Sequence, residues 1–136
     1  MSYKSLFTVL WSIAESLGYN PTLESDLHQT LLSKGFPMAS FAWAEAGSME
    51  GEKERRVQYD VTIKLMSDNV VGTKSRCEAM ASLMDSAGSF VALLGEASSV
   101  AAVELLELKP EERMLTIAGE CAVSLSLRLE CVECMN

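Results

Sequence analysis

The residues best suited to chemistry are two cysteines near the C-terminus, in the segment Cys131-Val132-Glu133-Cys134. A Cys-x-x-Cys pair can supply half of a zinc site or form a redox couple. Zinc needs two further ligands, and only Cys77, Cys121 and His28 are available, none of them closely paired in the sequence. Redox pairs usually begin a helix, whereas this pair follows a predicted strand. We therefore expect no metal, no cofactor and no functional disulfide here.

Acid–base chemistry has few candidates. His28 is the single histidine, and no serine or cysteine nucleophile with a matching acid is spaced around it as in a triad. The acidic pairs Glu52/Glu54 and Glu111/Glu112 lie in polar, turn-like stretches without an apolar pocket that would shift a carboxyl pKa. Solvated surface positions are the simpler interpretation, and we expect a protein that is not an enzyme and has no catalytic residues.

The length and net charge of the chain limit which kinds of molecule it is expected to bind. The 136 residues suit one domain, 1–136, with a hydrophobic core of its own. The formal net charge of −8 disfavours general binding to nucleic-acid phosphates and to anionic membranes. Gly47-x-x-x-Gly51 lacks the lysine and the strand–helix context of a phosphate-binding loop. We also expect no membrane-spanning segment and no signal peptide, so the default location is the cytosol.

Two segments alternate between apolar and polar residues, which is the period of a β-strand with one buried face. In the first, Val57–Met66, the apolar positions include Tyr59, Val61 and Ile63. In the second, Met114–Glu130, seven apolar residues share one parity. Two long strands of this kind predict an antiparallel sheet with one face covered.

Two further segments carry apolar residues at helical spacing. Residues Ser5–Leu17 show a stripe that includes Leu6, Leu10 and Ile13, widened by Phe7 and Trp11, and Gly18 follows where a helix would end. Residues Ser75–Leu94 show a second stripe, with a helix start near Thr73 or Ser75. These helices are predicted to cover the apolar face of the sheet.

The remaining segments are less regular. Met38–Ala46 is predicted to be extended, and Thr22–Gly35 is predicted to contain at most a short amphipathic turn or two. Val100–Leu108 is predicted to be a strand whose parity slips, as at a β-bulge or a sheet edge. Lys109–Arg113 is predicted to be a short hairpin connection, and Gly47–Arg55 a long charged one.

The resulting order is α-β-β-α-β-β. It predicts an α+β fold, with a mainly antiparallel sheet and the helices packed on one face. The other face is predicted to carry small or neutral residues at Thr62, Ser124, Ser126, Ala118 and Ala122. Such a face suits a packed neighbour better than open water, which is suggestive of self-assembly.

In the order of its elements the chain resembles the tail terminator (tail completion, or minor tail) proteins of long-tailed bacteriophages. The resemblance covers roughly Ser5–Glu130. It includes the N-terminal helix, Phe36-Pro37-Met38-Ala39 leading into a strand that ends near Glu45-Ala46-Gly47, and a charged loop. The strand Gln58–Leu65, the helix Arg76–Leu94, a further strand, a short hairpin and the alternating last strand complete it. The Thr22–Leu32 segment and the Cys131–Asn136 tail depart from the pattern.

The resemblance implies a non-enzymatic phage or prophage protein that assembles as a homo-hexameric ring on the tail tube, ends tube growth and forms the head–tail joining surface. The implied partners are other copies of itself, the tail-tube protein and the head connector protein, while DNA passes through without specific binding. The implied location is the virion tail, and the host cytoplasm during assembly. The implied contact arm is the charged loop, with the interaction residues Gly47, Met49, Glu50, Glu52, Lys53, Glu54 and Arg55.

A different class of function stays open from the sequence. A small ligand-binding or regulatory α+β domain would have the same pattern of elements, but it would need a concave apolar pocket with a few convergent polar groups. Catalysis is the third possibility.

Overall fold

The computed structural model describes residues 1–50, 55–68, 72–113 and 120–132. Its elements in chain order are the helix α1 (Tyr3–Ser16), the strand β1 (Asn20–Leu23), a 3₁₀ turn (Glu24–Asp26), α2 (Leu27–Ser33), β2 (Met38–Phe41), β3 (Glu45–Glu50), β4 (Arg55–Met66), α3 (Thr73–Glu96), β5 (Val100–Arg113) and β6 (Glu120–Val132).

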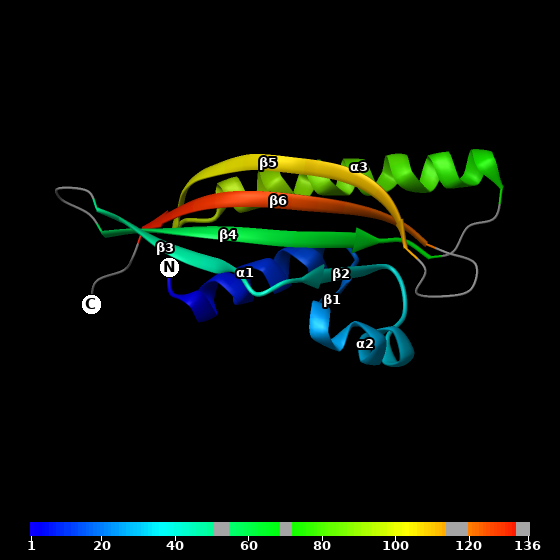
Figure 1. Ribbon diagram of the computed structural model, residues 1–136, viewed down its shortest axis with the longest axis horizontal. Helices are drawn as coiled ribbons and strands as arrows, with labels where there is room; N and C mark the ends of the chain where they lie inside the picture. The colour runs from blue at the N-terminus through cyan, green and yellow to red at the C-terminus, as the bar shows by residue number, and fades with distance from the viewer. Residues whose placement is uncertain (51–54, 69–71, 114–119, 133–136) are drawn as a thin grey trace.

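The six strands form one sheet in the order β1-β2-β4-β6-β5, and β3 pairs with β4 beyond the end of β2. The pairing of β1 with β2 is parallel, and every other pairing is antiparallel. Figure 1 shows β5 along one edge of the sheet, with β1 and β3 on the other side. The predicted α+β class with a mainly antiparallel sheet is therefore confirmed.

The centre of the sheet is the pair of strands with the clearest alternation. β4 and β6 run side by side over their lengths, so that Val61 lies opposite Leu127 and Ile63 opposite Leu125. All four side chains are almost fully buried. Both predicted long strands are confirmed, β4 beginning at Arg55 and β6 described from Glu120; the predicted start at Met114 lies outside the described residues.

The helices α1 and α3 cover the apolar face of these strands, with Leu6 and Leu10 from α1 and Phe90 and Leu94 from α3 in the same core. Both helices occur where they were predicted. α1 begins after Ser2, whose side chain accepts a hydrogen bond from the backbone N–H of Ser5 at 3.1 Å.

The chain leaves α1 at Gly18, which has a φ of +88°. This left-handed conformation is the one in which glycine commonly ends helices, as the sequence predicted.

The short helix α2 packs on the opposite face of the sheet. Leu27 of α2 forms a second apolar cluster with Met38, Met66 and Ala122, whose chain neighbours Leu65 and Val123 point into the main core. The expectation that the helices pack on one face is thus right for α1 and α3 and wrong for α2. Ala122, expected on an exposed face, is buried in this cluster.

Two elements near the N-terminus, β1 and the 3₁₀ turn, had no counterpart in the predicted order, whereas α2 corresponds to the short amphipathic turn or two that the sequence indicated in Thr22–Gly35. The segment Thr22–Gly35 contributes the last residues of β1, the 3₁₀ turn and α2. Asn20 in β1 lies beside Met38 in β2, and the Asn20 side-chain amide donates a hydrogen bond to the Gly35 carbonyl oxygen at 2.9 Å. This amide therefore closes the loop around α2 onto the sheet.

Two predicted connections have other bounds than expected. The sequence predicted a charged loop over Gly47–Arg55, but Gly47–Glu50 continue β3 and Arg55 begins β4 in register with Glu50. It also predicted a turn over Lys109–Arg113, but these residues continue β5 and pair with Glu120–Ser124 of β6. Edge strands tolerate polar residues and proline, because one side of their backbone faces water.

Among the described residues, one helix, α3, is long and apolar enough to cross a membrane, judged by length and composition. The expectation that no segment approaches such a span was too strong. In the folded chain Leu83, Ala87, Phe90 and Leu94 of this helix are buried in the core. Core helices pass the same test, so this helix is weak evidence for a membrane protein.

Candidate interaction surfaces

The helix α1 carries two apolar stripes. Leu6, Leu10 and Ile13 face the core, where each is at most 8% exposed. A second stripe, Tyr3, Phe7 and Trp11, repeats every four residues along the neighbouring flank of the helix. Leu6, Leu10 and Ile13 already bury one face of α1 in the core. The second stripe therefore leaves apolar surface on α1 that could contact another molecule.

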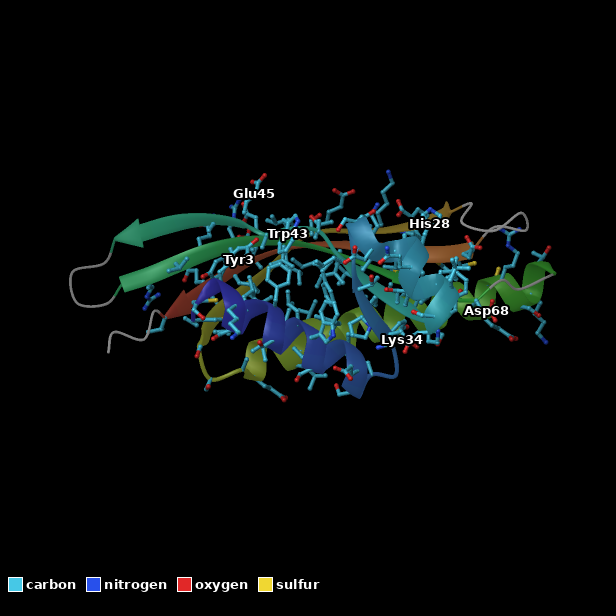
Figure 2. The ribbon with its side chains drawn as sticks, turned by 90° about the horizontal axis from the view of Figure 1, so that it is seen from below. Tyr3, His28, Lys34, Trp43, Glu45 and Asp68 are labelled. Atoms are coloured by element: carbon cyan, nitrogen blue, oxygen red, sulfur yellow. The ribbon has the colours of Figure 1, made fainter. Side chains whose placement is uncertain are left out.

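The second stripe forms one wall of an open groove of about 570 Å³. Leu23 of β1 and Trp43, in the turn between β2 and β3, form the other wall. The polar side chains that line it all come from α1: Lys4, Thr8, Ser12 and Glu15. We call this feature the α1 groove. Tyr3 and Trp43 are both labelled in Figure 2, near each other beside α1.

Trp43 is the most exposed aromatic side chain described at this groove, at 65%. It is nevertheless held in position: its ring lies 5.5 Å from that of Phe7, close to edge-on. Next to it in the chain, the Ala44 carbonyl oxygen accepts a hydrogen bond from the Tyr3 hydroxyl at 2.8 Å. The turn that carries Trp43 is therefore tied to the first turn of α1.

Aromatic contacts continue from the groove into the core. The ring of Trp11 lies 5.8 Å from that of Phe41, and Phe41 lies 6.2 Å from Phe90 of α3. Phe41 and Phe90 are fully buried. Trp11 therefore connects the α1 groove to the hydrophobic core.

A second exposed apolar feature lies on β5. Leu105 and Leu106 are each 46% exposed. The pairing with β6 slips between Leu105 and Glu107, which makes Leu106 the extra residue of a β-bulge. The parity slip predicted a β-bulge or an edge position, and β5 has both. We call Leu105 and Leu106 the β5 bulge pair.

The open part of the second sheet face carries Thr62, Ser124 and Ser126, as predicted, and also carries charged residues beside them. Ala118 lies outside the described residues. Arg128 of β6 donates a hydrogen bond from Nε to Asp60 Oδ1 at 3.0 Å, and this bond raises the pKa of the guanidinium above its ordinary value. The Nη1 atom of Arg56 lies 3.4 Å from Oε2 of Glu130, close enough for an ion pair. Thr62 and Ser126 lie opposite each other on this face. They separate the two ion pairs from Lys64, which lies further along β4.

Lys64 extends this charged surface toward α2. Its Nζ atom lies 3.8 Å from Glu24 and 3.7 Å from Glu111. Glu111, considered above for acid–base chemistry, is therefore part of an ion-pair cluster on the sheet. Positive and negative groups alternate over this face, and it is not the uniformly acidic surface that the net charge alone would suggest.

The interaction residues named from the sequence lie at one end of the β3–β4 hairpin. Gly47, Met49 and Glu50 belong to β3, and Arg55 begins β4. Glu52, Lys53 and Glu54 lie outside the described residues. The four described positions lie along one hairpin. This hairpin begins at Glu45, only two residues after Trp43 of the α1 groove.

Sequence reasoning missed the α1 groove. Phe7 and Trp11 were taken as a widening of the core stripe, and Trp43 as part of a strand. The available signal was the four-residue spacing of Tyr3, Phe7 and Trp11 beside a complete core stripe.

The cysteines and the histidine do not converge. Cys131 is fully buried in the main core, where burial raises the pKa of its thiol, and its Sγ lies 3.9 Å from Met1 Sδ. Cys77 and His28 are exposed. Cys134 lies outside the described residues, within which no three histidine, cysteine or acidic side chains are grouped to hold a metal.

Comparisons with known proteins add a likeness to a solved structure. No protein-family model matches the chain, and no curated protein matches it. Among solved structures, a chain of one titled "Virion of native gene transfer agent (GTA) particle" superposes with a TM-score of 0.49 and 13% sequence identity. The superposition covers 71% of this chain and 69% of that one. A match at this level carries no conclusion about function.

Proposed function

We propose that this chain is a non-enzymatic virion assembly protein of a long-tailed phage or prophage, which caps the tail tube as a ring. In this role it ends growth of the tube and forms the surface that joins the tail to the head connector. The order of elements from Ser5 to Glu130 supports the proposal through its resemblance to tail terminator proteins.

One observation supports assembly into a ring. The α1 groove and the β5 bulge pair are two unlike apolar surfaces, and they lie toward opposite edges of the same sheet. An interface between two copies of the same patch makes a closed dimer, whereas contacts between unlike patches continue from copy to copy and close into a ring when the rotation allows. Surfaces of the second kind suit a ring of one protein.

The β3–β4 hairpin is the proposed contact arm toward the tail tube, with Gly47, Met49, Glu50, Glu52, Lys53, Glu54 and Arg55 as its interaction residues. Charges of both signs in this segment suit a protein partner better than a phosphate backbone. The net charge of −8 per chain would let DNA pass through the ring without binding tightly.

The alternative is a small ligand-binding or regulatory domain, and the α1 groove is the observation that favours it. The groove is apolar and has a usable volume, but its polar side chains all come from one helix and do not converge on a point. Binding sites for small molecules usually enclose the ligand and fix it with a few convergent polar groups. The groove therefore fits a macromolecular partner better.

The test is to mix the purified protein with the tail-tube protein of the same phage and follow tube length by electron microscopy. We expect rings at tube ends and shorter tubes as the ratio of this protein rises. A variant with residues 51–54 replaced by Asn-Gly should stay folded and lose capping. Tubes of unchanged length with the wild-type protein would overturn the proposal, and normal capping by the hairpin variant would overturn the contact arm alone.

A further inference from the structure

We infer that Cys77 and Cys121 form a redox-active thiol pair. The exposed Cys77 reacts with a small disulfide such as oxidised glutathione, and the buried Cys121 then displaces the bound thiol. The product is a reversible disulfide that links the first turns of α3 to β6. The reaction depends only on the fold, so it is independent of the proposed capping role.

Both cysteines line the same cavity, which has a volume of about 360 Å³ and lies between the first two turns of α3 and β6. The other described residues that line it are Thr73, Arg76 and Met80, at helical spacing on one face of α3. Cys77 and Cys121 are far apart in the sequence, and it is the packing of α3 on the sheet that places them at one cavity.

A weak hydrogen bond shows how near the two residues lie. The Cys121 thiol donates it to the Arg76 carbonyl oxygen, with 4.0 Å between Sγ and O. Because Cys77 follows Arg76 directly, Cys121 Sγ lies within about 7 Å of the Cys77 Cα atom. The two Cα atoms of a disulfide are about 4.4–6.8 Å apart.

A small movement therefore brings the two sulfur atoms together. The Cys77 side chain is exposed, so it can turn toward the cavity without displacing core residues. The first turn of α3 can also shift, because Gly72 at the N-cap has no side chain that would hold the helix start in place.

The two thiols differ in exposure, and this difference assigns their roles. Cys77 is exposed, whereas Cys121 is only 5% exposed. A bulky disulfide can reach the first thiol and not the second. Redox-sensing cysteines are typically accessible and lie next to a second cysteine that resolves the first product, which is the arrangement seen here.

The chemistry consists of two successive thiol–disulfide exchanges. The Cys77 thiolate attacks one sulfur of oxidised glutathione, the S–S bond of the reagent breaks, and one glutathione leaves as a thiolate. The Cys121 thiolate then attacks Sγ of Cys77 and releases the second glutathione. In total the protein gives up two protons and two electrons, which convert one oxidised glutathione into two reduced ones.

The link has a defined consequence for the fold. A disulfide that closes a long loop restricts the unfolded chain and thereby stabilises the folded one. Glutathione keeps thiols reduced in the cytosol, whereas disulfides persist in oxidising surroundings. The link is therefore expected to form after the protein has folded and has left a reducing compartment.

The first experiment treats the reduced protein with oxidised glutathione at neutral pH, blocks the remaining thiols with N-ethylmaleimide and maps the cysteines by mass spectrometry without reductant. We expect linked peptides that contain Cys77 and Cys121 and that dithiothreitol separates. Cys121→Ser should stop at a glutathione adduct on Cys77, and Cys77→Ser should leave Cys121 reduced. Cys134→Ser is the matched control, and it should form the link as the wild type does.

The second experiment asks whether the fold directs the pairing. In urea the cavity is lost, and the wild type should instead link Cys131 to Cys134, which only two residues separate. In native buffer the oxidised wild type should melt roughly 5–10 °C above the reduced form, as followed by circular dichroism, whereas Cys121→Ser should show no such rise.

Three results would overturn the thiol pair. They are a wild-type protein that keeps glutathione on Cys77, a Cys77–Cys121 link that forms in urea but not in native buffer, and an oxidised form that melts no higher than the reduced one. Tube capping is measured separately, so its failure would leave the pair standing, and the loss of the pair would leave the capping role standing.

Discussion

Tyr59, at the centre of β4, donates a hydrogen bond from its hydroxyl group to the main-chain carbonyl oxygen of Met1 at 3.1 Å. Tyr59 is 3% exposed, and its ring packs close to edge-on at 5.9 Å from that of Tyr3. This bond fixes the chain that enters α1 against the middle of the sheet, and α1 in turn carries one wall of the groove.

Replacing Tyr59 with phenylalanine should therefore lower the free energy of unfolding by about 1 kcal/mol, because a buried hydrogen bond is lost while the ring remains. Urea denaturation followed by fluorescence measures the change. The matched variant is Tyr3→Phe, which removes a hydroxyl from a ring that is 37% exposed and should cost less. A larger loss at Tyr3 than at Tyr59 would contradict the assignment.

Two leucines should respond very differently to the same truncation. Leu125 of β6 is fully buried, and Leu125→Ala should lower the free energy of unfolding by about 2–5 kcal/mol, because it removes apolar contacts and leaves a cavity. Leu32 of α2 is 88% exposed, and Leu32→Ala should change it by less than about 0.5 kcal/mol. Equal effects in urea denaturation would mean that β6 is not the centre of the core.

Stability should fall at alkaline pH. Burial raises the pKa of the Cys131 thiol above its ordinary value of 9.0, and it raises the pKa of the Tyr19 hydroxyl above 10.0. The unfolded chain then releases these protons at lower pH than the folded chain does. Stability is complete below about pH 9 and is lost as the pH rises through the folded values.

The cysteine part of this loss can be isolated. Cys131→Ala should be less stable than the wild type at neutral pH, and its free energy of unfolding should fall less steeply between about pH 9 and 10. Cys77→Ala, which removes an exposed thiol, is the control for the loss of a cysteine. Identical slopes in all three proteins would show that Cys131 does not titrate differently in the folded state.

Thiol labelling gives an independent readout of the same burial. Cys77 on α3 is exposed and should react rapidly with a maleimide in the native protein. Cys121 and Cys131 are buried and should react only as fast as the protein opens. Mass spectrometry of digested, labelled protein assigns each site. Rapid native labelling of Cys131 would contradict its place in the core.

The sequence predicted best those elements whose pattern comes from a single buried face. β4 and α3 have such patterns, and both were found within a few residues of their predicted bounds. β1 was missed because its four residues are too short to show a period, and because it pairs in parallel with β2, eighteen residues away in the register. No local signal in Asn20-Pro21 indicates that partner.

The candidate site was harder to predict for a related reason. Whether Trp43 is buried or exposed depends on where β2 ends and on how α1 crosses the sheet, and neither is a local property of the sequence. Glu50 and Arg55 were read as a loop because they are charged, yet they extend a hairpin whose outer side faces water. Polarity marks solvent exposure more reliably than it marks irregular structure.

The irregularities of β5 should reduce aggregation of the protein at high concentration. A fourteen-residue strand at the edge of a sheet is a template on which further strands can add, and such addition leads to fibrils. Register shifts after Val100 and after Leu105 interrupt the edge, and Pro110 has no backbone N–H to donate to an added strand. Continuous addition of strands from other copies to this edge is thereby disfavoured.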